Sequence, residues 1–245
     1  MNAFTHLGRY LKLIGTSFSR PENWEVYFDN LIQEMNKQGV NSIGIVLVIS
    51  AFMGAVTTVQ TAYQLVSSLI PASVIGSVVS DSTILELAPT VTSLVLAGRI
   101  GSSIATEIGT MRVSEQIDAL EVMGINSASF LVLPKIVACV IMIPLLIIIA
   151  MSVSITGGII AGELSGIVTV NEFVYGMRDS FRTYTFVFAL VKTFTFAFVI
   201  STVSAYQGYF TKGGALEVGQ ASTKAIVWSS LLILFFDYLL AQLFL

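Results

Sequence analysis

Residues 131–161 read LVLPKIVACVIMIPLLIIIAMSVSITGGIIA and contain one charged side chain, Lys135. A helix needs about 20 consecutive apolar residues to cross the hydrocarbon core of a bilayer, and this run is longer. The whole chain is 55% hydrophobic and only 11% charged, whereas soluble domains carry about 25% charged residues. The strand alternation of an outer-membrane barrel is absent. We therefore predict an all-α integral membrane protein.

Apolar runs on either side bring the predicted number of membrane spans to five. Pro71 is placed to end the first span, and Thr83-Ile84-Leu85-Glu86 has the pattern of a capping box that begins the second. Pro134 and Pro144 are expected to kink the third span. The predicted spans are residues 43–70, 83–108, 131–161, 185–206 and 225–245.

The N-terminal residues 1–38 are predicted to form an amphipathic elbow that lies in the cytoplasmic interface, before a transmembrane domain of residues 39–245. Pro21 is placed to begin the second of two helices, and Arg9, Lys12 and Arg20 favour anionic headgroups. The alternative is a small soluble helical cap. The two apolar sets are Phe4, Leu7, Leu11, Ile14 and Phe18, then Trp24, Phe28, Leu31 and Met35.

The distribution of Lys and Arg predicts the orientation of the spans. Cytoplasmic segments carry an excess of these residues, and the segment between the first two predicted spans carries none. The rule places the N-terminus in the cytoplasm and, after five spans, the C-terminus in the periplasm. The residues on the cytoplasmic side are Arg9, Lys12, Arg20, Lys37, Arg112, Lys135, Lys212 and Lys224, and those between the third and fourth spans are Arg178 and Arg182.

Between the second and third spans, residues 107–124 read EIGTMRVSEQIDALEVMG. Ser114 is placed to cap a short helix. At 100° per residue, one stripe of this helix is acidic and the opposite one is apolar. We interpret the segment as a docking helix for a soluble partner; the alternative is a helix that lies on the membrane surface. The acidic stripe is Glu115, Asp118 and Glu121, and the apolar stripe is Ile117, Leu120 and Met123.

Small residues recur every fourth position on two spans, which lets helix backbones approach closely. We expect packing within the chain rather than a dimer seam. The two columns are Ala97, Gly101, Ala105 and Gly109 on the second span, and Gly158, Gly162 and Gly166 on the third.

Three charged residues fall deep inside predicted spans, where ionisable side chains usually face a bundle interior or a wet cavity. Lys192 and Asp237 lie at similar depths and are expected to form an ion pair, with either a transport role or a role in fixing helix register. Arg99 has no depth-matched acid, so it is a candidate for the lipid path; the alternative is that it binds backbone carbonyls at a kink. Gln60 is expected to hydrogen-bond across helices, and Glu107 to be solvated near the interface.

Several classes of function lack their motifs in this sequence. There is no phosphate-binding GxxxxGK[ST] loop, no nucleophile–base set and no basic stripe for nucleic acid. The single His6 excludes a histidine-rich metal site, and the single Cys139 excludes an intrachain disulfide. We therefore predict no catalytic residues, no metal and no cofactor, and a chain that is not an enzyme on its own.

Several segments together resemble the signature of the MlaE family, the permeases of ABC transporters that move phospholipid between the two membranes of double-membraned bacteria. The resemblance covers about residues 35–245. It rests on LAGRIGSSIATEIGTM (96–111), EQIDAL (115–120), MG (123–124), LP (133–134), GYFTKGGALEVGQASTKA (208–225), FMGAV (52–56) and QTAY (60–63).

The resemblance implies a homodimeric inner-membrane permease with a separate ATPase that binds the ATP, an MCE-domain protein on the periplasmic side, and a phospholipid pocket between the permease copies. Residues 107–124 would be the coupling helix, and the family motif maps onto Glu115, Gln116, Asp118, Ala119 and Gly124. The intramembrane charged positions match Arg99, Lys192 and Asp237. The rival interpretations are an ion-coupled secondary carrier and a membrane scaffold without a transport role.

Overall fold

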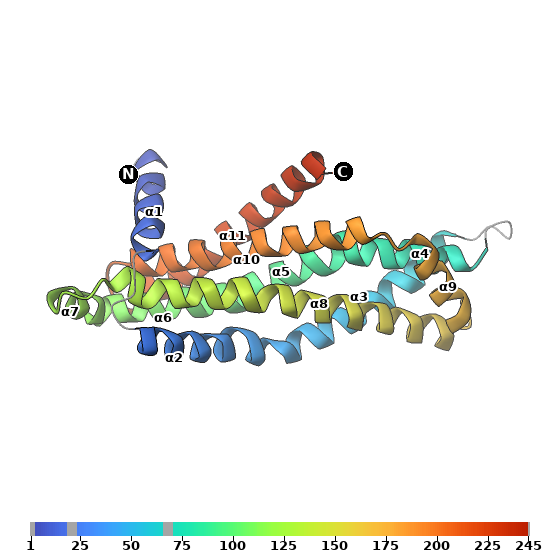
Figure 1. The fold of residues 1–245 in the computed structure, drawn as a ribbon, viewed down its shortest axis with the longest axis horizontal. Helices are drawn as coiled ribbons and strands as arrows, with labels where there is room; N and C mark the ends of the chain where they lie inside the picture. Colours follow the sequence, from blue (N-terminus) through green and yellow to red (C-terminus); the bar gives the residue numbers. More distant parts are fainter. Residues whose placement is uncertain (1–2, 19–23, 66–70, 245) are drawn as a thin grey trace. The chain divides into compact units, whose positions relative to one another are not determined.

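The computed structural model describes residues 3–18, 24–65 and 71–244, and every regular element in these ranges is a helix (Figure 1). In chain order the elements are α1 (Ala3–Ser17), α2 (Trp24–Glu34), η1 (Met35–Gly39), η2 (Val40–Ser42), α3 (Ile43–Gln64), α4 (Ser73–Ser82), η3 (Thr83–Val91), α5 (Thr92–Leu96), η4 (Ala97–Gly101), α6 (Ser102–Val113), α7 (Gln116–Val122), η5 (Ala128–Val132), α8 (Leu133–Leu164), α9 (Val170–Ser180), α10 (Thr183–Tyr209) and α11 (Ala215–Phe244). The predicted all-α class is confirmed.

Five continuous helices in the described residues are long and apolar enough to cross a membrane, which confirms the predicted number of spans. Several run through π-helical turns, where the hydrogen-bond ladder widens by one residue. The long α8 continues through Pro144 without a break, and Pro134 lies in its first turn. The five helices are Trp24–Gln64, Ser73–Val113, Ala128–Leu164, Thr183–Tyr209 and Ala215–Phe244.

The predicted capping box at the start of the second span is wrong. The helix already begins at Ser73, and Thr83 has helical dihedrals of −66° and −47° with a buried hydroxyl that has no described partner. A capping box does occur elsewhere in the chain, at Thr169 and Glu172, where each side chain accepts a hydrogen bond from the other residue's backbone N–H, at 3.3 and 3.0 Å. It begins α9, a helix that the sequence analysis treated as loop.

The N-terminal region forms two helices, as predicted, but the second continues into the first span. α2, η1, η2 and α3 make one helix from Trp24 to Gln64, so the helix does not break at the boundary proposed between residues 38 and 39. The predicted roles of Arg20 and Pro21, and the end of the first span at residue 70, lie outside the described residues.

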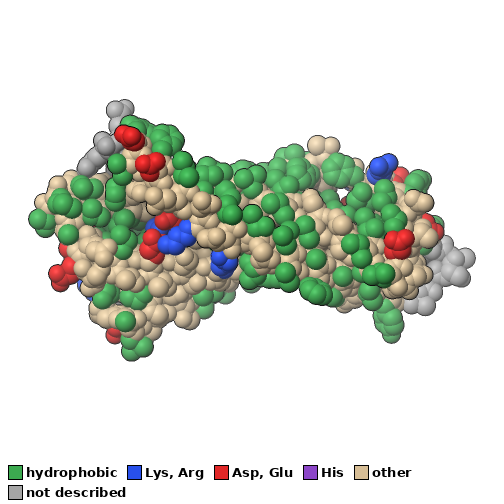
Figure 2. Space-filling view, turned by 90° about the horizontal axis from the view of Figure 1, so that it is seen from below, with side chains coloured by type: hydrophobic (Ala, Val, Ile, Leu, Met, Phe, Trp, Pro, Cys, Tyr) green, Lys and Arg blue, Asp and Glu red, His purple; other side chains and the backbone are tan. Residues whose placement is uncertain are grey.

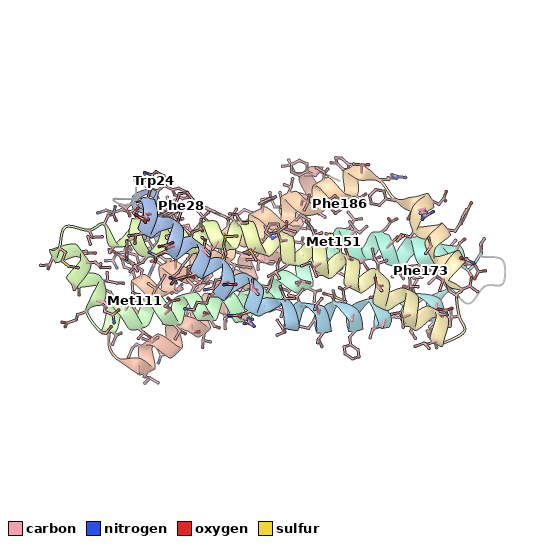
Figure 3. All side chains as sticks on the ribbon, turned by 60° about the horizontal axis from the view of Figure 1, so that its bottom comes forward. Trp24, Phe28, Met111, Met151, Phe173 and Phe186 are labelled. Atoms are coloured by element: carbon pink, nitrogen blue, oxygen red, sulfur yellow. The ribbon has the colours of Figure 1, made fainter. Side chains whose placement is uncertain are left out.

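The apolar face predicted for α1 is exposed, which suits a helix lying in a membrane interface. Leu13 faces the other way and packs against Ala128 and Tyr206. Further along the chain, Trp24 and Phe28 are exposed on the first turns of α2 (Figure 3). The exposed apolar residues are Phe4, Leu7 and Leu11 of α1 and Phe18, which directly follows it.

The chain forms two compact units. The first consists of Met1–Asn41, Leu94–Ile143 and Thr195–Phe236. In it, the small-residue column of the second span packs within the chain, as expected. A Cβ added to Gly101 would lie 2.9 Å from the Ser204 hydroxyl oxygen, and one added to Gly208 would lie 2.7 Å from the Ala105 carbonyl oxygen.

The second unit consists of Ser42–Ser93, Pro144–Phe194 and Asp237–Leu245, and two close helix crossings hold it together. α3 meets α8 at Gly54, where an added Cβ would lie 1.7 Å from the Ser154 carbonyl oxygen, and α4 meets α9 at Gly176 in the same way. Gly158 and Gly162 also pack within the chain, against Thr58. The third member of their column, Gly166, instead follows the end of α8 with a positive φ of 69°.

Large hydrophobic side chains cover much of the surface, and charged side chains gather at a few places (Figure 2). This pattern is expected where the surrounding solvent is hydrocarbon rather than water. The large exposed apolar residues of α11, for example, are Leu216, Val227, Trp228, Leu231, Leu234, Phe235, Tyr238, Leu239, Leu243 and Phe244.

Candidate functional site

The predicted docking helix exists as α7, but Ser114 does not cap it. The Ser114 hydroxyl donates to the Thr110 carbonyl oxygen at 2.8 Å and so belongs to the end of α6. The residue at the N-cap position is Glu115, which has a φ of 60°. Non-glycine residues rarely adopt this left-handed conformation, and it makes the sharp turn between α6 and α7.

The two faces of α7 differ from the predicted stripes. Ile117 is fully buried, as expected, but Met123 is 65% exposed and its neighbour Val122 is 89% exposed. The helix has only seven residues, and the rest of the protein contacts only part of its apolar stripe. We use the name docking face for the exposed residues from Glu115 to Gly124, which are Glu115, Gln116, Asp118, Ala119, Glu121, Val122, Met123 and Gly124.

Two of the three acidic residues are bound to the rest of the first unit rather than free. Asp118 accepts a hydrogen bond from Arg112 at 2.6 Å. Glu121 accepts hydrogen bonds from the hydroxyls of Ser127 and Tyr209, both at 3.0 Å. Glu115 remains as the acid of this stripe whose side chain has no ion pair with a described residue.

Tyr209, at the end of α10, holds the docking helix in place. Its hydroxyl lies 2.7 Å from that of Ser127, and the Arg112 guanidinium lies over its ring, 6.0 Å from the centroid. A cation over a ring face is attracted by the ring quadrupole. α7 is therefore fixed to α6 through Arg112 and to α10 through Tyr209, so its orientation is set before any partner binds.

The expectation that Glu107 is simply solvated is wrong. Its carboxylate accepts hydrogen bonds from Lys135 at 2.7 Å and from Lys37 at 2.6 Å. Lys135 is only 4% exposed and also forms an ion pair with Glu34. These four residues, Glu34, Lys37, Glu107 and Lys135, are called the Lys135 cluster below. Lys135 was predicted only as one of the cytoplasmic charges, although its place inside an apolar run is a signal of burial.

The predicted ion pair between Lys192 and Asp237 is present, at 2.5 Å, and it includes a third charge. The Lys192 ammonium, which is 0% exposed, also contacts Glu86 at 2.9 Å and donates to the Leu85 carbonyl oxygen at 3.0 Å. The Thr90 hydroxyl bridges the two carboxylates, at 3.3 Å from Glu86 and 3.2 Å from Asp237. Lys192, Glu86 and Asp237 are called the Lys192 cluster.

Glu86 is absent from the residues predicted to lie deep in a span, because the predicted second span begins only at residue 83. A span that begins at residue 83 leaves Glu86 at the membrane surface, where a capping role suffices. The helix begins at Ser73, so Glu86 lies well inside it. A carboxylate well inside an apolar segment of this length is a signal, visible in the sequence, that the residue has a buried charged partner.

A polar hollow of about 500 Å³ opens beside Glu86 in the second unit. Gln60 lies in it but makes no side-chain hydrogen bond with a described residue, contrary to expectation. On α3 the lining residues recur at helical spacing, so one face of this membrane helix is polar. The lining consists of Thr57, Gln60, Thr61, Gln64, Asp81, Ser82, Leu85, Glu86 and Leu87.

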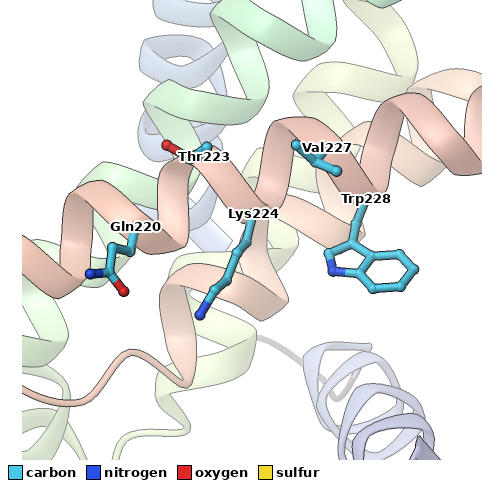
Figure 4. Close-up of a pocket in the computed structure, with 5 residues that line it drawn as sticks. All are labelled: Gln220, Thr223, Lys224, Val227 and Trp228. Carbon is cyan, nitrogen blue, oxygen red and sulfur yellow. The ribbon is translucent and has the colours of Figure 1, made fainter.

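Arg99 lies half-buried in the π-helical turn η4 and has no ion pair with a described residue, in line with the absence of a depth-matched acid. A smaller hollow of about 300 Å³ lies along α11, where Lys224 and Trp228 project from neighbouring turns (Figure 4). Lys and Trp are frequent at membrane–water interfaces.

Five membrane-length helices and an exposed, firmly held helix between two of them define a multi-pass membrane protein of the helical class. Residues 31–243 match the family model described as Permease MlaE. The chain therefore belongs to the MlaE permease family, and it is a permease subunit.

Related proteins support this assignment along nearly the whole chain. The chain is 38% identical to a probable ABC transporter permease protein of Rickettsia bellii, over 94% of this chain and 87% of the relative. It is 34% identical to one of Synechocystis, over 87% of this chain and 81% of the relative. It is also 31% identical to protein TRIGALACTOSYLDIACYLGLYCEROL 1, chloroplastic, of Arabidopsis thaliana, over 90% of this chain and 63% of the relative.

Proposed function

We propose that this chain is the membrane subunit of an ABC transporter that moves phospholipid between the inner and outer membranes of a bacterium, driven by a separate ATPase. The observation that carries the proposal is the docking face of α7. It exposes apolar side chains at Val122 and Met123 beside Glu115, an acid without an ion pair to a described residue, while Tyr209 and Arg112 hold the helix behind it. An exposed apolar patch with a polar rim is typical of a protein–protein contact.

The proposed partners follow from the family and from the charges. The positive-inside rule puts α7 in the cytoplasm, where the ATPase binds ATP, and the C-terminus in the periplasm. A second copy of the chain completes the membrane part, and an MCE-domain protein binds on the periplasmic side. ATP binding by the ATPase would move both docking helices, and the spans would open or close a lipid pocket.

Three observations support a lipid substrate. The Arabidopsis relative is named for a diacylglycerol lipid. In this chain, the polar hollow beside the Lys192 cluster offers amide, hydroxyl and carboxylate groups on otherwise apolar helices, which suits a headgroup with hydrogen-bond donors. In the first unit, Arg99 carries a guanidinium whose planar fork matches a phosphodiester, so we propose that it takes part in headgroup recognition.

The test is purification of the full chain in mild detergent, with the co-purified proteins and lipids identified by mass spectrometry. We expect an ATP-binding cassette protein and phospholipid. Val122→Asp, which puts a charge on the docking face, should remove the ATPase but not the lipid, because a buried unpaired charge opposes association. Leu164→Asp, an exposed apolar residue at the far end of α8, is the matched control.

An ion-coupled carrier acting alone is the second candidate, and the Lys192 cluster favours it because buried ionisable groups can relay protons. Reconstitution in vesicles separates the two. Lipid movement by the chain without an ATPase, dependent on a pH gradient, would support the carrier. Movement that requires ATP and the co-purified ATPase would support the ABC transporter.

A further inference from the structure

We propose that the Lys135 cluster is an ionic joint that links the docking helix to the first membrane span, with Glu34 and Lys37 as its positioning residues. The inference rests on the proposed function, because it names the path by which a movement of α7 reaches the rest of the chain. The cluster lies within the first unit.

Both helices that flank the docking helix contribute one charge to the cluster. Glu107 lies on α6, which leads into α7, and Lys135 lies on α8, which follows it. Their contact at 2.7 Å closes the base of the hairpin that carries the docking helix. Because Lys135 is 4% exposed, water cannot replace Glu107 as its partner, and the two helices are held at a fixed spacing.

The other two charges come from the helix of the first span. Glu34 binds Lys135, and Lys37 binds Glu107 at 2.6 Å, so the same helix contacts both flanks of the hairpin with charges of opposite sign. Two carboxylates and two ammonium groups leave the cluster neutral. Two ion pairs with opposite polarity fix both the distance and the register of the first span against the hairpin. A contact between apolar side chains is not directional and would not fix the register.

Local structure around Glu34 and Lys37 supports a mechanical role. Glu34 directly precedes η1, the π-helical turn Met35–Gly39, and Lys37 lies in it; such turns are frequent at functional sites. The Gln38 amide donates to the second carboxylate oxygen of Glu34 at 3.1 Å, which orients it. Gly39 then meets Met142 of α8 so closely that an added Cβ would lie 2.2 Å from the methyl carbon. The position of Glu34 is therefore supported by the Gln38 hydrogen bond and by the close contact of Gly39 with α8.

The structure also suggests a variant that removes the ion pairs between the first span and the hairpin without leaving a buried charge unpaired. Glu34→Gln with Lys37→Gln removes one negative and one positive group from the same helix. Glu107 and Lys135 keep each other, so the base of the hairpin stays closed and the chain should still fold. The matched control is Glu163→Gln with Lys212→Gln, which removes the same charges from exposed positions that have no ion pair with a described residue.

The first readout is coupling. The chain is purified with its ATPase in lipid nanodiscs, and lipid-stimulated ATP hydrolysis is measured per assembled complex. We expect the joint variant to assemble normally but to lose at least about fivefold in stimulation, the low end of coupling between linked sites. The control variant and the charge-conserving pair Glu34→Asp with Lys37→Arg should stay near the wild-type value.

The second readout is the distance between spin labels at Asn36→Cys and Thr106→Cys, two exposed positions beside the cluster, in a Cys139→Ala background. We expect one narrow distance with and without ATP in the parent, and a broadened, ATP-dependent distribution in the joint variant. Normal coupling and an unchanged narrow distance in the joint variant would overturn the joint while leaving the transporter intact. A wild-type preparation that contains no ATPase would overturn the proposed function, and the coupling role with it.

Discussion

The two carboxylates around Lys192 should substitute for each other, so removing both should destabilise the protein by more than the sum of the single changes. After Asp237→Asn, the ammonium keeps Glu86 at 2.9 Å and the Leu85 carbonyl at 3.0 Å. After Glu86→Gln, it keeps Asp237 at 2.5 Å. Only the double variant leaves a charge that is 0% exposed without an anionic partner among the described residues.

The magnitudes follow from the burial of each partner. Asp237 is 17% exposed, and a hydrogen bond between charged groups at such a site contributes about 1.5–3 kcal/mol. Glu86 is 46% exposed, so solvent screening limits its single loss to about 1 kcal/mol or less. Residues that share one partner show coupling of about 0.5–3 kcal/mol, and we expect the double variant to lose about 1–2 kcal/mol beyond the sum.

The assay is thermal unfolding of the purified chain in detergent. For a chain of this size, 1 kcal/mol corresponds to a shift in Tm of about 2–4 °C, so the excess loss should be roughly 2–8 °C. Adding Lys192→Met to the double variant should recover stability, since an apolar side chain of similar volume replaces a stranded charge. The single and double changes at the exposed acids Glu163 and Glu172 to Gln should be additive.

Two results would refute this reasoning. One is additivity of the two changes within about 0.5 kcal/mol, the precision to which independent sites add. The other is a further loss of stability when Lys192→Met is added to the double variant. Either would mean that Lys192 is held by something other than the two carboxylates.

Three further predictions concern the proposed transport. Arg99→Ala should leave expression and melting temperature near normal but lower the phospholipid retained per folded protein, with Arg99→Lys intermediate because the charge is kept and the fork is lost; a large fall in melting temperature with unchanged lipid would make Arg99 structural. Reversing Glu115 and Asp118 to Lys should abolish lipid-stimulated ATP hydrolysis, since the docking face loses its complementarity with the ATPase, and full stimulation would contradict the docking role. Tyr209→Phe removes the hydroxyl that holds Glu121 and should weaken the same stimulation by several-fold while complex assembly, measured by size-exclusion chromatography, stays intact; normal stimulation would show that α7 needs no such anchor.

The sequence predicted the features that depend on composition and on span length. Apolar runs longer than a bilayer requires lead to helices in any membrane protein, because no other single-segment structure satisfies the backbone there. Depth matching placed Lys192 opposite Asp237 for a related reason: a charge in hydrocarbon needs a partner at the same level. These inferences need only distances along the chain.

The features that the sequence analysis missed depend on where helices begin and how they pack. A capping-box pattern at Thr83 predicts the start of the second span there, whereas the helix already runs from Ser73 through Thr83, and the Thr169–Glu172 box begins a different helix, α9. A local pattern does not reveal whether the preceding residues already belong to the helix. Similarly, Met123 is apolar at helical spacing, but whether the body of the protein reaches it is a question of tertiary packing.

The two buried lysines show why pairs read from a sequence are incomplete. A lysine ammonium has three N–H donors and no acceptor, and in the absence of water each donor seeks an acceptor from protein. Lys192 finds two carboxylates and a carbonyl, and Lys135 finds two carboxylates. The acceptors of each come from more than one helix, since one turn of a neighbouring helix rarely presents two acids. A deep lysine in a membrane span therefore indicates a meeting of at least three helices, and a search for its partners should continue after the first acid is found.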